Sequence, residues 1–65
     1  MKTGQKLNVT MLNGRTFKYV VTQSESNGVF KMKTSRGKKS FIVNSKNLTW
    51  NENGLNLQAE KIELA

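Results

Sequence analysis

Residues 7–21 read LNVTMLNGRTFKYVV, two runs of alternating apolar and polar side chains joined by Asn13-Gly14. Alternation with a period of two is the pattern of a β-strand that has one buried face. Asn-Gly tolerates the positive φ angles that tight hairpin turns require. The stretch therefore predicts an antiparallel hairpin whose strands cover 5–12 and 15–22.

Similar turn signals recur along the chain. Further turn signals stand at Asn27-Gly28, Arg36-Gly37 and Asn53-Gly54. Turn signals at intervals of roughly ten residues are typical of a meander of short strands. The alternating runs between them predict strands over 28–34, 40–44 and 48–50.

The C-terminal segment admits two interpretations. Apolar residues alternate from Leu55 to Ala59, whereas Ile62 and Leu64 fall in the opposite phase. A β-bulge near Glu60-Lys61 would restore the register of one long strand. A short helix is the alternative, because the residues around the phase change have good helix propensity. We favour the strand.

Five or six short strands in one domain, residues 1–65, must bury their apolar faces on one another. The simplest all-β solution is an antiparallel meander that closes into a small barrel of the SH3-like or Sm-like kind, since closure removes exposed edges. The core of so short a chain is modest, so a homo-oligomer that buries more surface is left open. The side chains expected to point inward are Leu7, Val9, Met11, Phe17, Tyr19, Val21, Phe30, Met32, Phe41, Val43, Leu48, Trp50, Leu55 and Leu57.

The composition excludes most enzyme classes. The chain has no cysteine, histidine, aspartate or proline, and four glutamates are its only acids. It therefore lacks a thiol nucleophile, an imidazole base and the common soft metal ligands. A phosphate loop at Arg36-Gly37 lacks its first glycine, and no pair of glutamates is placed for acid–base chemistry. We expect a non-catalytic binding protein without a cofactor or a metal.

No targeting or membrane segment is expected. Residues 1–6 have no apolar core of the kind that a secretory signal needs, and no apolar run approaches the length of a membrane span. These observations predict a cytoplasmic protein that does not bind membranes. The high content of Lys and Asn is typical of AT-rich genomes, as in many bacteria of low GC content and their phages.

The positive charge is concentrated in one block. Eleven Lys and Arg give a formal net charge of +7, and no acidic residue lies between Ser26 and Asn51. Lys31 and Lys33 are two apart on a predicted strand and so share a face. We expect this strand face and the turn that follows to form a cationic hairpin, the basic finger, made of Lys31, Lys33, Arg36, Lys38 and Lys39. Lys46 belongs to the same acid-free block, and Arg15 and Lys18 extend the finger if the second strand pairs with the third.

Such a patch suits a phosphate backbone, so the first hypothesis is binding of RNA or single-stranded DNA. Phe17, Tyr19, Phe30 and Phe41 fall on the phase of the core, although the Tyr19 hydroxyl would suit the mouth of the barrel. Trp50 precedes a polar turn and is the best candidate for base stacking. Backbone contacts should therefore outweigh base readout.

Two other partners fit the same features. The protein could be a small modulator, encoded by a phage or another mobile element, that docks on an acidic host protein. It could also be a structural subunit that neutralises a polyanion in a larger assembly. A fourth interpretation needs no partner: the lysines form a solvated hairpin face that maintains solubility.

Residues 7–15 resemble the first motif of Sm-like proteins, an apolar alternating strand that ends in Asn-Gly and leads into a second strand. Sm-like proteins are five-stranded SH3-type barrels that assemble into rings and bind RNA, and the resemblance implies these properties. The family's glycine in the second strand has no counterpart at Lys18-Tyr19-Val20. Arg36-Gly37 precedes Phe41 and does not lie between the last two strands. No RNA-binding residue is therefore carried over from the family.

Overall fold

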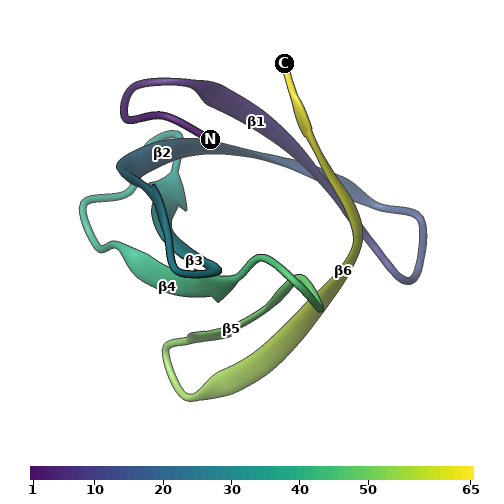
Figure 1. Cartoon of the computed structure of the whole chain (residues 1–65). Coiled ribbons are helices and arrows are strands. Elements are labelled where there is room, and N and C mark those ends of the chain that lie inside the picture. The colour runs from purple at the N-terminus through teal and green to yellow at the C-terminus, as the bar shows by residue number, and fades with distance from the viewer.

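The computed structural model describes residues 1–65 and consists of six antiparallel strands (Figure 1). Each strand pairs with the next along the chain, and β1 pairs with β6, so the meander closes into a barrel. The all-β class, the closed barrel and the final strand are thus as predicted. The strands are β1 (Lys6–Met11), β2 (Thr16–Ser26), β3 (Val29–Thr34), β4 (Phe41–Asn44), β5 (Thr49–Glu52) and β6 (Leu55–Leu64).

The Asn-Gly pairs close the hairpins as expected. Asn27 and Gly28 both have positive φ, 53° and 80°, and form a two-residue loop between β2 and β3. Asn53 and Gly54 do the same between β5 and β6, with φ of 53° and 89°. Positive φ at both central residues is the mark of a type I′ turn, whose twist matches that of the flanking strands.

The predicted bulge lies in β6. Thr10 pairs with Lys61 and Met11 with Ala59, so Glu60 is the extra residue. The bulge returns Ile62 to the inward phase, opposite the buried Val9. One continuous strand therefore pairs with β5 over its first half and with β1 over its second.

β2 is longer than predicted and ends at Ser26 instead of residue 22. Its last residues are polar and show no alternation, so the sequence pattern stops before the strand does. The N-terminal segment lies against this extension, where Gly4 N–H donates to the Val21 carbonyl and Glu25 N–H to the Met1 carbonyl. Two register shifts against β3 accompany the long strand.

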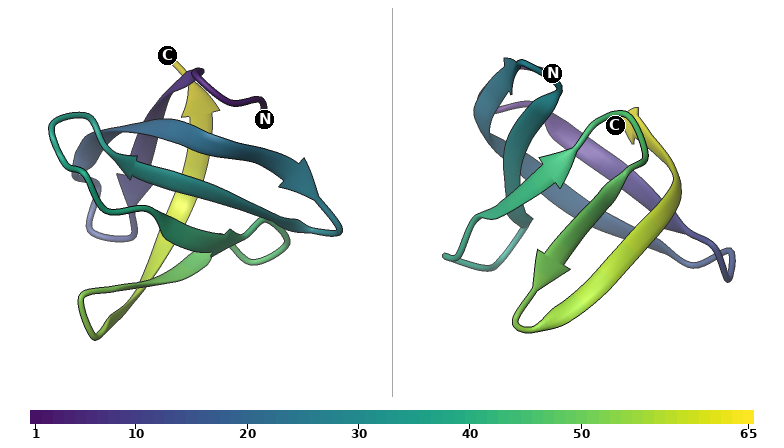
Figure 2. Two further views of the ribbon diagram at one scale, coloured as in Figure 1. Left: turned by 90° about the vertical axis from the view of Figure 1, so that its left-hand side faces the viewer. Right: turned by 60° about the horizontal axis from the view of Figure 1, so that its bottom comes forward.

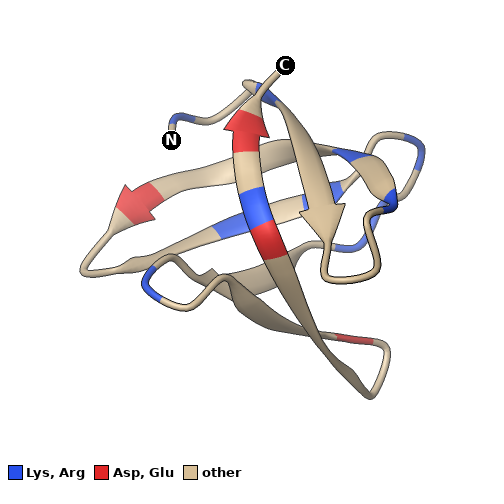
Figure 3. Ribbon diagram, turned by 90° about the vertical axis from the view of Figure 1, so that its right-hand side faces the viewer, with Lys and Arg blue, Asp and Glu red and all other residues tan.

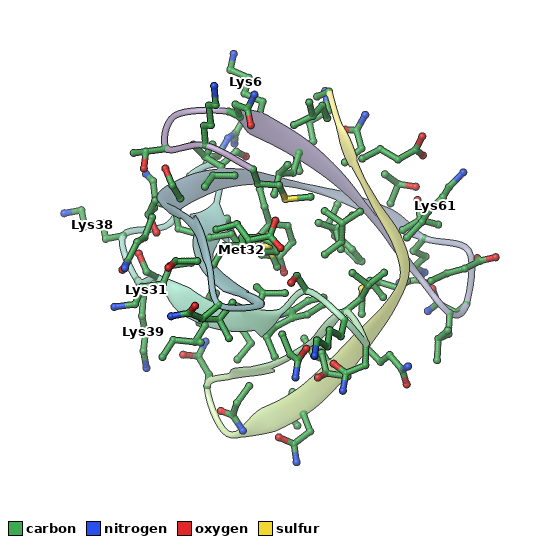
Figure 4. The ribbon with its side chains drawn as sticks, viewed as in Figure 1. Lys6, Lys31, Met32, Lys38, Lys39 and Lys61 are labelled. Atoms are coloured by element: carbon green, nitrogen blue, oxygen red, sulfur yellow. The ribbon has the colours of Figure 1, made fainter.

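The core follows the predicted phase, with two exceptions. Figure 4 shows Met32 pointing into the barrel, and the buried set is Leu7, Val9, Tyr19, Val21, Phe30, Met32, Phe41, Val43, Trp50 and Ala59. Phe17 and Leu55, predicted to point inward, are 46% and 66% exposed. Both lie in strand segments beyond the end of a neighbouring strand, where the barrel wall no longer covers them. Met11, Leu48 and Leu57 are half-buried.

The meander sorts its connections between two ends of the barrel (Figure 2). The β1–β2, β3–β4 and β5–β6 connections share one end, which we call the hairpin end and define as residues 12–15, 35–40 and 53–54. The β2–β3 and β4–β5 turns lie at the opposite end with both termini. The structure offers no helix with the length and apolarity needed to cross a bilayer.

Candidate functional site

The outer face of the barrel carries a set of lysines on neighbouring strands. Lys6 on β1 pairs with Val20 on β2, which in turn pairs with Lys33 on β3. Lys18 and Lys31 lie in the same outward phase, on β2 and β3. The predicted pairing of β2 with β3 is confirmed, so Lys18 adjoins the basic finger.

The finger continues into the β3–β4 connection. Arg36, Lys38 and Lys39 are exposed there, and Lys31, Lys38 and Lys39 extend from the same side of the barrel in Figure 4. Lys61 extends from the opposite side. Cationic side chains on this side of the barrel therefore come from both β3 and the loop that follows it.

Lys33 has a structural part in this loop. Its Nζ donates to the Gly37 carbonyl at 3.1 Å, and Gly37 N–H donates to the Thr34 carbonyl at 3.0 Å. A Cβ at position 37 would collide with the Thr34 hydroxyl, so glycine fits where a larger residue would force Thr34 to move. These contacts hold the start of the loop against the end of β3.

Few of the basic side chains are neutralised within the chain. Of the eleven Lys and Arg, only Lys61 forms an ion pair, with Glu63 at 3.2 Å. The other ion pair joins the N-terminal amine to Glu25 at 3.5 Å. Figure 3 shows several of the basic positions (blue) at the hairpin end and others along the strands and at the opposite end, whereas β6 carries acidic and basic positions in turn. The cations at the hairpin end are free to meet an external anion.

The predicted site residues Arg15 and Lys46 lie at opposite ends of the barrel. Arg15 lies in the β1–β2 connection and joins the other cations at the hairpin end. Lys46 lies in the β4–β5 turn, where its Cε would be 3.9 Å from a Cβ at Gly28. Lys46 is separated from the loop cations Arg36, Lys38 and Lys39 in the fold, because β4 carries the chain to the opposite end of the barrel.

A pocket of about 400 Å³ opens within the hairpin end. Its walls include the apolar side chains of Met11, Phe17 and Leu57, and its polar groups come from Tyr19, Thr34 and Glu52. Arg15 and Lys18 also contribute to its lining. The pocket is the mouth of the barrel, at the end where the rows of inward side chains on β1, β2, β5 and β6 end.

A carboxylate is held at this mouth by two donors. The Tyr19 hydroxyl donates to Glu52 Oε1 at 2.7 Å, and Trp50 Nε1–H donates to the same oxygen at 3.1 Å. The two rings also meet edge to face, with centroids 6.0 Å apart. Burial raises the pKa of Tyr19 far above its ordinary value, and the hydrogen bond to Glu52 and its negative charge raise it further. The phenol is therefore a permanent donor at physiological pH.

The predicted burial of the two aromatic residues near the mouth is reversed. Trp50, the predicted stacking residue, is only 4% exposed, because β4 and β6 pair with β5 on both sides of it. Phe17, predicted to lie in the core, presents its ring to the pocket because β3 ends at Thr34, opposite Tyr19, and leaves Phe17 uncovered. The sequence analysis did not consider strand length. Where one strand extends past the end of its neighbour, its inward residues in that extension are left uncovered.

Comparison with known proteins identifies no relative of this chain, since no protein-family model, no curated protein and no solved structure matches it.

Proposed function

We propose that the protein binds single-stranded nucleic acid, with the phosphates lying along the basic finger and the hairpin end. The observation that carries the proposal is the set of unpaired cations that the fold collects from three places in the sequence. They lie in the β1–β2 connection, on the outer face of β2 and β3, and in the β3–β4 connection.

Single-stranded substrates suit the geometry better than a duplex. The cations lie on both the outer face and the hairpin end of a barrel that measures 27 × 23 × 22 Å, and an unpaired chain can bend around that surface. The chain has no helix that could enter a major groove. Small β-barrels bind single strands by combining a cationic surface with exposed aromatic rings.

The test compares two charge reversals of equal size. Lys38→Glu/Lys39→Glu alters the hairpin end, and Lys2→Glu/Lys46→Glu makes the same change in net charge at the opposite end. Binding to labelled single-stranded RNA, single-stranded DNA and duplex DNA is measured by fluorescence anisotropy at several salt concentrations.

We expect the wild-type protein and the Lys2/Lys46 variant to bind alike. The Lys38/Lys39 variant should bind more weakly, and its log–log salt slope should fall by roughly 1.5, about 0.7 for each phosphate of a single strand that the protein no longer neutralises. Equal losses in both variants would show that net charge alone drives binding and would reject the site. No binding by the wild-type protein near physiological salt would reject the function and favour an acidic protein as the partner.

A further inference from the structure

The mouth pocket contains apolar side chains and a carboxylate, neither of which phosphate binding requires. The side chains of Met11, Phe17 and Leu57 form apolar parts of its wall, and the carboxylate of Glu52 is among its polar groups. A carboxylate repels phosphate, so a strand held at Arg15 and Lys18 must turn another part of the nucleotide toward the pocket. We infer that the pocket accepts one unpaired base of the bound strand, and that it selects guanine; this inference rests on the proposed function.

The exposed ring of Phe17 supplies the stacking surface. Phe17 is the one aromatic residue of the chain with a substantially exposed ring, at 46%, and it lies beside Arg15 and Lys18 in the pocket lining. Stacking of a base on an aromatic ring is favourable for any base. Phe17 therefore contributes affinity for a base at this position, and the selection must come from a polar group.

Glu52 supplies the selection. Both of its internal hydrogen bonds end on Oε1, and Oε2 makes none within the chain. An ionised carboxylate only accepts hydrogen bonds. Guanine has two adjacent N–H donors on its Watson–Crick edge, N1–H and N2–H, whereas adenine, cytosine and uracil each present one donor group beside an acceptor. A carboxylate therefore favours guanine over the other bases.

The surroundings fix the orientation of this acceptor. Tyr19 and Trp50 are both buried, and both donate to Oε1, which fixes the carboxylate in the mouth. No lysine or arginine lies within ion-pair distance of Glu52, so its charge remains available to a ligand. A pocket volume of about 400 Å³ lies in the range of small-ligand sites, about 300–1,000 Å³.

The experiment measures binding of a ten-residue oligouridine and of the same strand with one central guanine, adenine or cytosine. We expect the strand with guanine to bind roughly tenfold more tightly than the other three, the size of one good two-bond base contact. Phe17→Ala should weaken binding of all four strands. Glu52→Gln should remove the preference for guanine while the salt dependence persists, because the glutamine carbonyl still accepts from Tyr19 and Trp50 but its amide group donates.

Leu55→Ala is the matched control for Phe17→Ala, since Leu55 is 66% exposed and does not line the pocket. Equal affinity of the wild-type protein for all four strands would overturn the inference and leave the proposed function standing. Persistence of the guanine preference in Glu52→Gln would also overturn it. Failure of the wild-type protein to bind any of the strands would reject both proposals together.

Discussion

The hydrogen bond from Tyr19 to Glu52 should contribute a large part of the stability of this small barrel. Tyr19→Phe removes the hydroxyl and leaves the buried ring and its edge-to-face contact with Trp50 in place. The bond is short, 2.7 Å, and its acceptor is charged. Hydrogen bonds to charged groups contribute about 1.5–3 kcal/mol to the free energy of unfolding.

The loss should be visible as a large change in melting temperature. In a domain of this size, 1 kcal/mol corresponds to about 4–8 °C, so we expect Tyr19→Phe to lower Tm by on the order of 10 °C. Thermal and urea unfolding can be followed by far-UV circular dichroism and by the fluorescence of Trp50, the only tryptophan. Circular dichroism is needed as well, because the substitution changes the surroundings of the indole.

A double-mutant cycle isolates the contribution that the charge of the carboxylate makes to this bond. Glu52→Gln keeps a neutral acceptor, and Tyr19→Phe/Glu52→Gln should lose less than the sum of the two single changes, by about 1 kcal/mol. A Tm for Tyr19→Phe within about 2 °C of the wild type would refute the reasoning, since the expected loss is several times larger. It would mean that water replaces the hydroxyl at Glu52 without cost and that the mouth is wetter than its geometry indicates.

Three further outcomes follow from the structure. Tyr19 is the only tyrosine, and its pKa is raised because the folded protein favours the neutral phenol. The free energy of unfolding should therefore be unaffected by this group below about pH 10, the pKa of tyrosine in the unfolded chain. It should fall as the pH rises above that value. Tyrosinate absorbance should then appear together with unfolding, and titration near pH 10 in a protein that remains folded would contradict this. Phe30→Ala should cost about 3–5 kcal/mol of unfolding free energy, whereas the half-exposed Phe17→Ala should cost far less, so similar losses in urea unfolding would show that Phe17 is a core residue. Gly54→Ala places a side chain at φ 89° and should cost about 1–2 kcal/mol, which an unchanged Tm would disprove.

Local pattern was sufficient to predict the order of the strands and the hairpin turns of this protein, but not the full length of β2. The alternation over residues 7–21, the Asn-Gly pairs and the phase change near Glu60 each depend on neighbours in the chain, and the structure contains the corresponding hairpins and bulge. The extension of β2 to Ser26 escaped prediction because its polar residues carry no alternation and are held by the N-terminal segment.

The candidate site depended on information that no local pattern contains. Phe17 and Trp50 have the same inward phase, but one is exposed and the other buried, because burial depends on which strand lies opposite and where that strand ends. Lys46 is separated from the loop cations of the finger, and Arg15 joins them, because an antiparallel meander sends alternate connections to opposite ends of the barrel. The sequence by itself determined the strands and the net charge of +7, while the closure of the barrel decided which cations meet and placed Glu52 beside an exposed aromatic ring.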